Sequence, residues 1–238
     1  MKHINLLPGW GLAPETMQPL REALLERLPQ ASVDIVPLPA IQLSSLETDL
    51  SSLAQQLKPG VLIGWSLGGM LAVQLNRRFP EHFTRVVTLA SNACFIERKD
   101  WQPAMPTEIF KMFYQNYRDD PEKASKRFAL LVAQGSTEAR QLARDLQWDA
   151  LTAEQRLHGL AVLGMLDNRV ALRSPLQPML HCFGARDALV PVAAAEAIGA
   201  LHTPSRIAIS YQAGHALPLE QPQWLATEIA DWLERAGG

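Results

Sequence analysis

A serine lies at the point where the chain is expected to pass from a strand into a helix. Ser66 is the central residue of the motif G-W-S-L-G at residues 64–68, between the apolar residues 61–63 and a helix-like segment at 69–75. The flanking glycines leave room for a cramped turn that pushes the serine hydroxyl out from the edge of the sheet. Strand, tight turn and helix in this order are typical of a nucleophile elbow, so we predict that Ser66 is a nucleophile.

Two residues further along the chain have the right chemistry to activate this hydroxyl. A serine needs a general base at neutral pH, and the base needs a carboxylate that orients it and stabilises its charge. Asp187 and His215 each follow an expected strand, at residues 179–183 and 207–211. The chain order serine, acid, histidine is that of the α/β-hydrolases. We therefore predict Ser66, Asp187 and His215 as the catalytic residues.

Each of these residues also has an ordinary structural interpretation. A loop aspartate after a strand is usually a turn former or a helix cap, and a loop histidine is usually a surface residue. Asp149 and Asp167 are rival acids, but they fall within the largely helical stretch between residues 90 and 178 or at its edge, and not after a strand, which favours helix-end roles. The order and the three strand-end positions together favour the catalytic interpretation.

The oxyanion that forms during acyl transfer needs two hydrogen-bond donors. The amide of Leu67 lies at the expected helix N-terminus, where free N–H groups and the helix dipole stabilise negative charge. The second donor should come from the loop after the first strand, Pro8-Gly9-Trp10-Gly11. We predict the Trp10 amide, with its indole forming a wall of the pocket.

Strands and helices alternate along the chain, which positions these residues at one edge of a sheet. Helices are expected at residues 16–28, 46–57 and 224–235. Strands are expected at residues 4–7, 33–38, 61–65, 85–90, 179–183 and 207–211. Apolar strands separated by helices predict an α/β fold, with a mostly parallel sheet of about six strands that is covered on both faces.

The pattern changes between residues 90 and 178, where no good strand is found. This stretch is expected to form helices at 106–118, 121–134, 136–148 and 152–165. We predict an inserted helical cap at residues 96–169 over the carboxyl ends of the strands, where open α/β sheets bind ligands. Residues 1–95 and 170–238 would then form the hydrolase core.

Composition and charge argue against nucleic-acid-binding, membrane-spanning and metal-binding functions. The formal net charge of −2 provides no general attraction for nucleic acid, and no apolar run is long enough to span a membrane. Cys94 and Cys182 form no C-x-x-C pair and no metal-ligand spacing with the histidines, so we expect reduced structural thiols. A serine triad needs no metal or organic cofactor, and we expect none. The apolar run at the N-terminus is too short for a signal peptide, so we expect a cytoplasmic protein. We also expect it to be a monomer.

Four stretches of the chain together match one family of hydrolases. They are the elbow extended to Gly69, the segment Ser91-Asn92-Ala93-Cys94-Phe95, and residues 127–131 and 135–144 in the expected cap. With these stretches the chain resembles the BioH family, the pimeloyl-ACP methyl ester carboxylesterases of biotin synthesis, and residues 127–131 and 135–144 look like that family's lid. The elbow is general to α/β-hydrolases, whereas the lid match is far more specific. Two features depart from the family pattern: Pro8 replaces a histidine before Gly9, and the usual N-terminal strands do not precede the first strand.

This resemblance implies roles for the site residues. It implies the same triad and oxyanion donors, so substrate would contact Trp10, Ser66, Leu67 and His215. The acyl channel would be lined by Phe128, Ala129, Leu130, Leu131 and Val132. An acidic acyl carrier protein would dock on Lys123 or Lys126, Arg127, Arg140 and Arg144.

The spacing of two arginines supports the docking surface. Arg140 and Arg144 lie one helical turn apart and share a helix face, where guanidinium groups can pair with carboxylates or a phosphate. A solvated basic face is the alternative. The expected function is hydrolysis of the methyl ester of pimeloyl-acyl carrier protein. A general short-chain carboxylesterase or thioesterase with no protein partner is the main alternative, and an inactive hydrolase used as a binding module is a weaker one.

Overall fold

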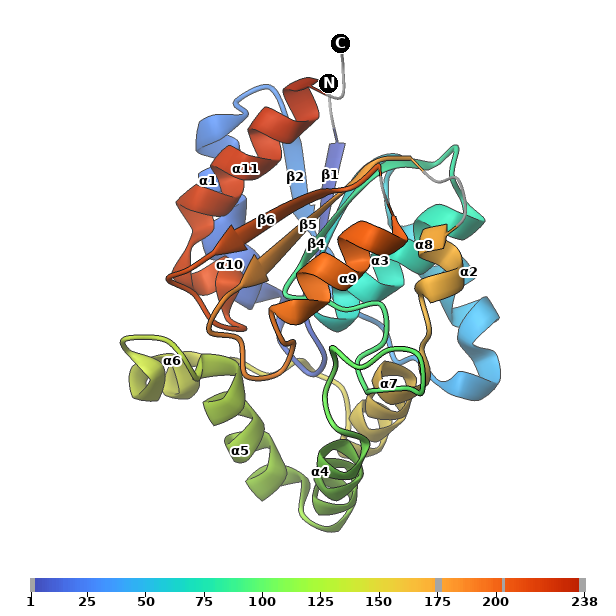
Figure 1. The fold of residues 1–238 in the computed structure, drawn as a ribbon, viewed down its shortest axis with the longest axis vertical. Helices are drawn as coiled ribbons and strands as arrows, with labels where there is room; N and C mark the ends of the chain where they lie inside the picture. The colour runs from blue at the N-terminus through green and yellow to red at the C-terminus, as the bar shows by residue number, and fades with distance from the viewer. Residues whose placement is uncertain (1–2, 174–176, 203, 236–238) are drawn as a thin grey trace.

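Six parallel strands form one sheet in the order β2-β1-β3-β4-β5-β6 (Figure 1). The computed structural model describes residues 3–173, 177–202 and 204–235. The strands are β1 His3–Leu7, β2 Ser32–Ile35, β3 Gly60–Trp65, β4 Phe83–Leu89, β5 Met179–Gly184 and β6 Arg206–Ser210. The expected parallel α/β sheet is confirmed.

The order of the strands creates a switch point between β1 and β3. The chain runs from β1 outward to β2, returns to β3 on the other side of β1, and then continues in one direction to β6. The loops that leave β1 and β3 therefore diverge at their carboxyl ends, which is where open α/β sheets form a ligand crevice. The Pro8–Gly11 loop and Ser66 both lie at this point.

Helices cover both faces of the sheet (Figure 1). On one face lie α1 Gln18–Arg27 and α11 Pro222–Arg235, and on the other α2 Leu46–Gln56, α3 Leu67–Arg78, α8 Arg169–Arg173 and α9 Ala193–Leu201. Short turns η1 Pro14–Met17, η2 Leu43–Ser45 and α10 Leu217–Glu220 complete these layers. Residues 67–76 of α3 are all buried, so the helix that starts at the elbow is anchored along almost its whole length.

Four helices lie across the carboxyl ends of the strands (Figure 1). They are α4 Thr107–Asp119, α5 Pro121–Ala133, α6 Ala139–Asp145 and α7 Ala153–Met165, and we call them the cap. Asp120 caps α5 by accepting the Lys123 amide, and Thr152 and Gln155 form a capping box on α7. The division of the chain into core and cap domains at residues 96 and 169 stays a prediction.

Helix α6 is shorter than the expected segment 136–148. Residues 147–149 instead pair with the loop after β1: the Ala13 amide donates to the Gln147 carbonyl at 2.9 Å, and the Asp149 amide to the Gly11 carbonyl at 3.0 Å. The Gln147 carbonyl and the Asp149 amide are therefore bonded to the loop after β1 and not to other residues of a helix. Helix α6 accordingly ends earlier, at Asp145.

No helix within residues 3–173, 177–202 and 204–235 combines the length and the apolar character needed to cross a membrane.

Candidate active site

Ser66 has a backbone conformation that a non-glycine residue rarely adopts. Its φ is +54° and its ψ is −116°, at the junction of β3 and α3. The Ser66 amide donates to the Leu89 carbonyl at 2.9 Å, and the Ser91 hydroxyl donates to the Ser66 carbonyl at 2.8 Å. These bonds hold a strained turn of a kind that costs on the order of 1–3 kcal/mol and is concentrated at functional sites.

Two glycines let the backbone close around this turn. A Cβ on Gly64 would lie 2.2 Å from the Gly68 carbonyl oxygen, and one on Gly68 would lie 2.4 Å from the Pro8 carbonyl oxygen. Neither position can carry a side chain without moving backbone. The G-x-S-x-G pattern is therefore required by the close approach of β3, α3 and the loop after β1.

Asp187 and His215 lie in contact, although 28 positions separate them. His215 Nδ1 is 2.8 Å from Asp187 Oδ2, and both side chains are 1% exposed. The carboxylate can only accept, so the Nδ1–H donates to it. Asp187 Oδ1 accepts the Leu189 and Val190 amides at 2.8 and 2.9 Å, which fixes the carboxylate. Strands β5 and β6 are parallel neighbours, so their carboxyl-end loops meet.

The residue next to the serine fixes the histidine loop. The Trp65 indole N–H donates to the His215 carbonyl at 2.8 Å, and the two rings are 6.0 Å apart. His215 is therefore tied to the elbow through Trp65 and to the acid through its own Nδ1. Its Nε2 is the ring nitrogen that remains for a serine hydroxyl.

The loop after β1 lies against the serine. A Cβ on Gly9 would be 3.5 Å from Ser66 Cβ, so the backbone at Gly9 passes next to the Ser66 side chain. In the described part of the chain, the Trp10 amide makes no backbone hydrogen bond. Leu67 is the first residue of α3, where an amide has no partner inside the helix. Both predicted oxyanion donors thus border Ser66.

Contacts with the cap hold the loop after β1 in place, because the side chain of Pro8 cannot form a hydrogen bond. The Trp10 indole N–H donates to the Arg156 carbonyl of α7 at 2.7 Å, and residues 11–13 pair with residues 147–149. Trp10 is 2% exposed and packs edge-on against Phe113, Tyr117 and Phe128, with centroid distances of 5.8, 5.2 and 5.0 Å. The indole therefore forms a wall between the sheet and the cap.

The predicted acyl-channel residues do not all face the same way. Phe128, Ala129 and Val132 are buried, Leu131 is half-buried, and Leu130 is 56% exposed. Successive residues of an α-helix point about 100° apart, so five in a row cannot line one channel. Phe128 and Val132, one turn apart, face inward, whereas Leu130 belongs to the outer surface.

A groove with basic residues at its rim opens on that outer surface, between α5 and α6. Its volume is about 590 Å³. It is lined by Lys126, Ala129, Leu130, Arg140, Ala143, Arg144, Leu146 and Trp148. The structure therefore brings Lys126, Arg140 and Arg144 together around an apolar floor. Lys123 and Arg127 are exposed on α5, outside the described lining of this groove.

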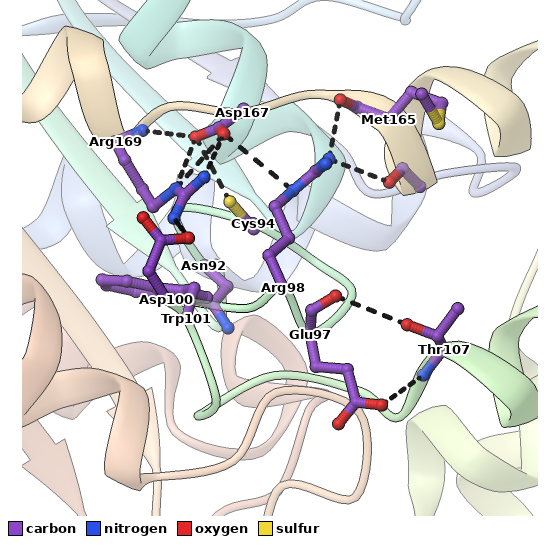
Figure 2. A network of polar contacts seen from close by, with 11 residues as sticks. Asn92, Cys94, Glu97, Arg98, Asp100, Trp101, Thr107, Met165, Asp167 and Arg169 are labelled. Carbon is purple, nitrogen blue, oxygen red and sulfur yellow. Dashed lines mark hydrogen bonds and ion pairs between the residues drawn. The ribbon is translucent and has the colours of Figure 1, made fainter.

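The rival acids are engaged by arginines. Asp149 accepts from Arg156 Nε at 2.7 Å. Asp167 accepts from Arg169 and from the Cys94 thiol, in the network that joins the segment after β4 to the start of α8 (Figure 2). Although burial acts to raise it, hydrogen bonds from Arg169 lower the pKa of Asp167 to about 2. Asp187, and neither of these two acids, pairs with His215 Nδ1. Asp167 Oδ1 also accepts the amide of Arg169, the first residue of α8, at 3.0 Å, whereas Asp149 lies in the loop between α6 and α7.

Both cysteines are free and buried. Burial, together with the Asp167 hydrogen bond, raises the pKa of Cys94 to about 11, and burial raises the pKa of Cys182 as well. Both thiols therefore stay protonated at neutral pH. Among the described residues, no group of three or more histidines, cysteines and carboxylates is placed to hold a metal ion.

Two supporting residues were not predicted from the sequence. Trp65 lies inside the elbow motif and Ser91 directly after β4, but nothing in their local pattern reveals their partners. The available signal is their position at strand ends beside the candidate site.

A parallel sheet with a strained serine after β3, and with an acid and a histidine on the loops after β5 and β6, defines the class of α/β-hydrolase proteins. The alpha/beta hydrolase family model matches residues 6–228. Solved structures agree on the fold: an esterase from Exiguobacterium antarcticum has a TM-score of 0.80 at 17% identity, covering 98% of this chain and 92% of that one. A bromoperoxidase from Bacillus anthracis has a TM-score of 0.81 at 16% identity, covering 98% and 92%.

Curated relatives narrow the class. The "Biotin biosynthesis bifunctional protein BioHC" of Cellvibrio japonicus is 37% identical over 96% of this chain, and that of Teredinibacter turnerae is 36% identical over 96%. The chain spans about half the length of these two relatives, 47% and 44%. The "Pimeloyl-[acyl-carrier protein] methyl ester esterase" of Salmonella enteritidis is 34% identical over 92% of this chain and 89% of its own length. The chain belongs to the alpha/beta hydrolase family and, within it, to the BioH family of these esterases, as the sequence resemblance predicted.

Proposed function

We propose that this protein is a serine carboxylesterase that hydrolyses the methyl ester of a pimeloyl group carried on acyl carrier protein. The observation that carries the proposal is the buried Asp187–His215 pair, which Trp65 ties to the elbow that carries the strained Ser66. The relatives named for this reaction support the choice of substrate, since one of them matches over nearly its full length. The cytoplasmic address and the monomeric state stay predictions from the sequence.

In the first half of the reaction, Ser66 Oγ attacks the carbonyl carbon of the methyl ester while His215 Nε2 takes the hydroxyl proton. The amides of Leu67 and Trp10 stabilise the oxyanion, and Asp187 stabilises the imidazolium. The tetrahedral intermediate collapses, the C–O bond to the methoxy group breaks, and His215 returns the proton to the leaving methanol.

In the second half, water attacks the acyl-enzyme and gives its proton to His215. Collapse of the second tetrahedral intermediate releases the free carboxylic acid and returns the proton to Ser66 Oγ. The acyl chain lies along the inward face of α5, against Phe128 and Val132, which are buried and apolar. A newly formed carboxylate is poorly accommodated there, which favours release of the product.

The groove between α5 and α6 supports the choice of a protein-bound substrate. Arg140, Arg144 and Lys126 place three cationic side chains around an apolar floor. Acidic side chains and a phosphate on an acyl carrier would be attracted to this rim. We propose these three residues, together with the exposed Lys123 and Arg127, as the docking surface.

The experiment that tests the nucleophile is hydrolysis of p-nitrophenyl acetate by Ser66→Ala. Removing the attacking oxygen should lower kcat on the order of 10³-fold or more. Ser52→Ala, an exposed serine of α2, is the control and should keep the parent rate. If Ser66→Ala stays within about tenfold of the parent, another residue is the nucleophile. Growth of a biotin auxotroph lacking its esterase, on biotin-free medium, tests the physiological role with the same two variants.

A further inference from the structure

Glu220 holds the backbone directly before the proposed base. It is the last residue of α10, and its Oε2 accepts the Gly214 amide at 2.9 Å. Gly214 and His215 are buried, whereas Glu220 is half-buried at the edge of the site. A carboxyl group therefore fixes the peptide next to the imidazole.

The same carboxyl group reaches the cap. The Ser136 hydroxyl donates a hydrogen bond to Glu220, and Ser136 Oγ itself accepts the Glu138 amide at 3.2 Å. Glu138 directly precedes α6. A chain of hydrogen bonds thus runs from the start of α6 through Ser136 and Glu220 to Gly214.

The cap turn at residues 134–136 packs on both triad loops through backbone. A Cβ on Gly214 would lie 2.4 Å from the Gln134 carbonyl oxygen. A Cβ on Gly135, whose φ is +95°, would lie 2.6 Å from the Arg186 carbonyl oxygen. No side chain separates the turn from the loops of His215 and Asp187. A shift of the turn must therefore shift these loops.

The position is electrostatically costly for a carboxyl group. Burial raises the pKa of Glu220 and the nearby negative charge of Asp187 adds to this, while hydrogen bonds from Gly214 and Ser136 oppose it. The ester hydrolysis proposed above uses one carboxylate, Asp187. A second carboxyl group kept beside it at a cost points to a role in holding the loop.

We propose that Glu220 is a positioning residue that fixes the Gly214–His215 backbone and ties it to the cap turn, so that the imidazole stays aligned between Asp187 and Ser66. This inference rests on the proposed esterase function. Because the imidazole must meet two partners at hydrogen-bond distance, a displacement of about 1 Å is enough to slow a reaction on the order of 100-fold.

The test compares Glu220→Ala and Glu220→Gln on p-nitrophenyl acetate. The alanine variant loses the acceptor, so kcat should fall about 10- to 100-fold while KM changes less than about threefold. Glutamine keeps one acceptor oxygen for Gly214 and should restore kcat to within about threefold of the parent. Ser136→Ala keeps the Gly214 contact but loses the cap link, so kcat should fall by a smaller factor of about 2 to 5.

Glu228→Ala is the matched control. Glu228, on α11, is also a partly buried, hydrogen-bonded carboxylate, 2.6 Å from Arg206 Nη2, but Arg206 begins β6, at the opposite end of the strand from the site. It should lose thermal stability without losing kcat. If Glu220→Ala keeps the parent kcat, or if glutamine fails to restore it, the positioning role is overturned. If Ser136→Ala keeps the parent kcat, the link to the cap is overturned.

Ser66→Ala distinguishes a failure of the positioning role of Glu220 from a failure of the proposed esterase function. An active Ser66→Ala enzyme overturns the proposed mechanism and the inference built on it. An inactive one, together with an unaffected Glu220→Ala enzyme, overturns the positioning role alone.

Discussion

The two oxygens of Asp187 have different partners. Oδ1 accepts two backbone amides, from Leu189 and Val190, and Oδ2 accepts His215 Nδ1–H. The amides fix which side of the carboxyl group faces the imidazole. This arrangement predetermines the tautomer of His215, because only a proton on Nδ1 leaves Nε2 able to take the serine proton.

Asp187→Asn should therefore abolish most of the activity. The asparagine oxygen must face the Leu189 and Val190 amides, so its NH2 group points at His215 Nδ1 and forces the proton onto Nε2. We expect kcat for p-nitrophenyl acetate to fall on the order of 10³- to 10⁴-fold, as for other serine triads.

The control is Asp34→Asn. Asp34 lies on β2, and the substitution removes its exposed ion pair with Lys58. It should keep kcat within about twofold of the parent. An Asp187→Asn enzyme with comparable activity would show that Asp187 does not set the tautomer of the base.

At the scale of elements, α6 is held at both ends by the loops of the proposed catalytic residues. The turn before it, residues 134–136, packs on the loops of Asp187 and His215. The segment after it, residues 147–149, pairs with the loop that carries Trp10. A seven-residue helix would be marginal by itself, so these tertiary contacts provide most of its stability.

The base of the cap is held by the network around Asp167 (Figure 2). Asp167 and Arg169 follow α7, whereas Cys94, Arg98 and Asp100 follow β4. Arg98 donates to the Met165 carbonyl at 2.9 Å, and Arg169 pairs with both Asp167 and Asp100. The two chain segments that connect the cap to the sheet are thereby joined to each other.

Asp167→Asn should lower the free energy of unfolding in a pH-dependent way. The folded-state pKa of about 2 lies below the ordinary value of 3.8, so the carboxylate stabilises the fold above 3.8 and loses this effect as the pH falls towards 2. At about pH 6 we expect a loss of about 1 kcal/mol, reduced by partial exposure of the pair.

Urea unfolding of parent and Asp167→Asn between about pH 6 and pH 3 measures this difference. It should be constant above about pH 5 and shrink below about pH 4. Asp231→Asn removes an exposed ion pair with Arg27 and serves as the control. A difference that does not change with pH would show that ionisation of Asp167 does not stabilise the cap connections.

At the scale of the whole molecule, charge is unevenly distributed. The formal net charge is −2, yet Arg140, Arg144 and Lys126 surround one groove on the outer surface of the cap. The inward face of α5 packs on the aromatic residues around Trp10, and its outer face forms the floor of this groove. One helix thus separates the proposed acyl site from the proposed docking surface.

Replacing Arg140 and Arg144 together by alanine should raise KM for the carrier-borne ester about 10-fold or more and leave p-nitrophenyl acetate hydrolysis unchanged. Raising the salt concentration from about 0.05 to 0.3 M should weaken turnover of the carrier-borne ester by the parent for the same reason.

The control is the double variant Arg27→Ala/Arg77→Ala, which makes the same charge change on α1 and α3, away from the cap. Equal effects of the two double variants, or turnover that does not depend on salt, would remove the docking proposal and favour a general esterase without a protein partner.

The sequence by itself determined the parallel sheet and the order Ser66, Asp187, His215. Apolar runs, glycines and strand ends are local features, and a parallel sheet brings the carboxyl ends of its strands together wherever they lie in the chain. The alternation of strand and helix was therefore enough to predict which residues would border the candidate site.

Only the tertiary structure decided the length of α6, the outward direction of Leu130, and the contacts of Trp65 and Glu220. Each depends on a partner far away in the chain: residues 11–13 for the end of α6, the His215 carbonyl for Trp65, and Ser136 for Glu220. Local pattern specifies the backbone hydrogen bonds within an element, whereas a bond between elements exists only once the chain has folded.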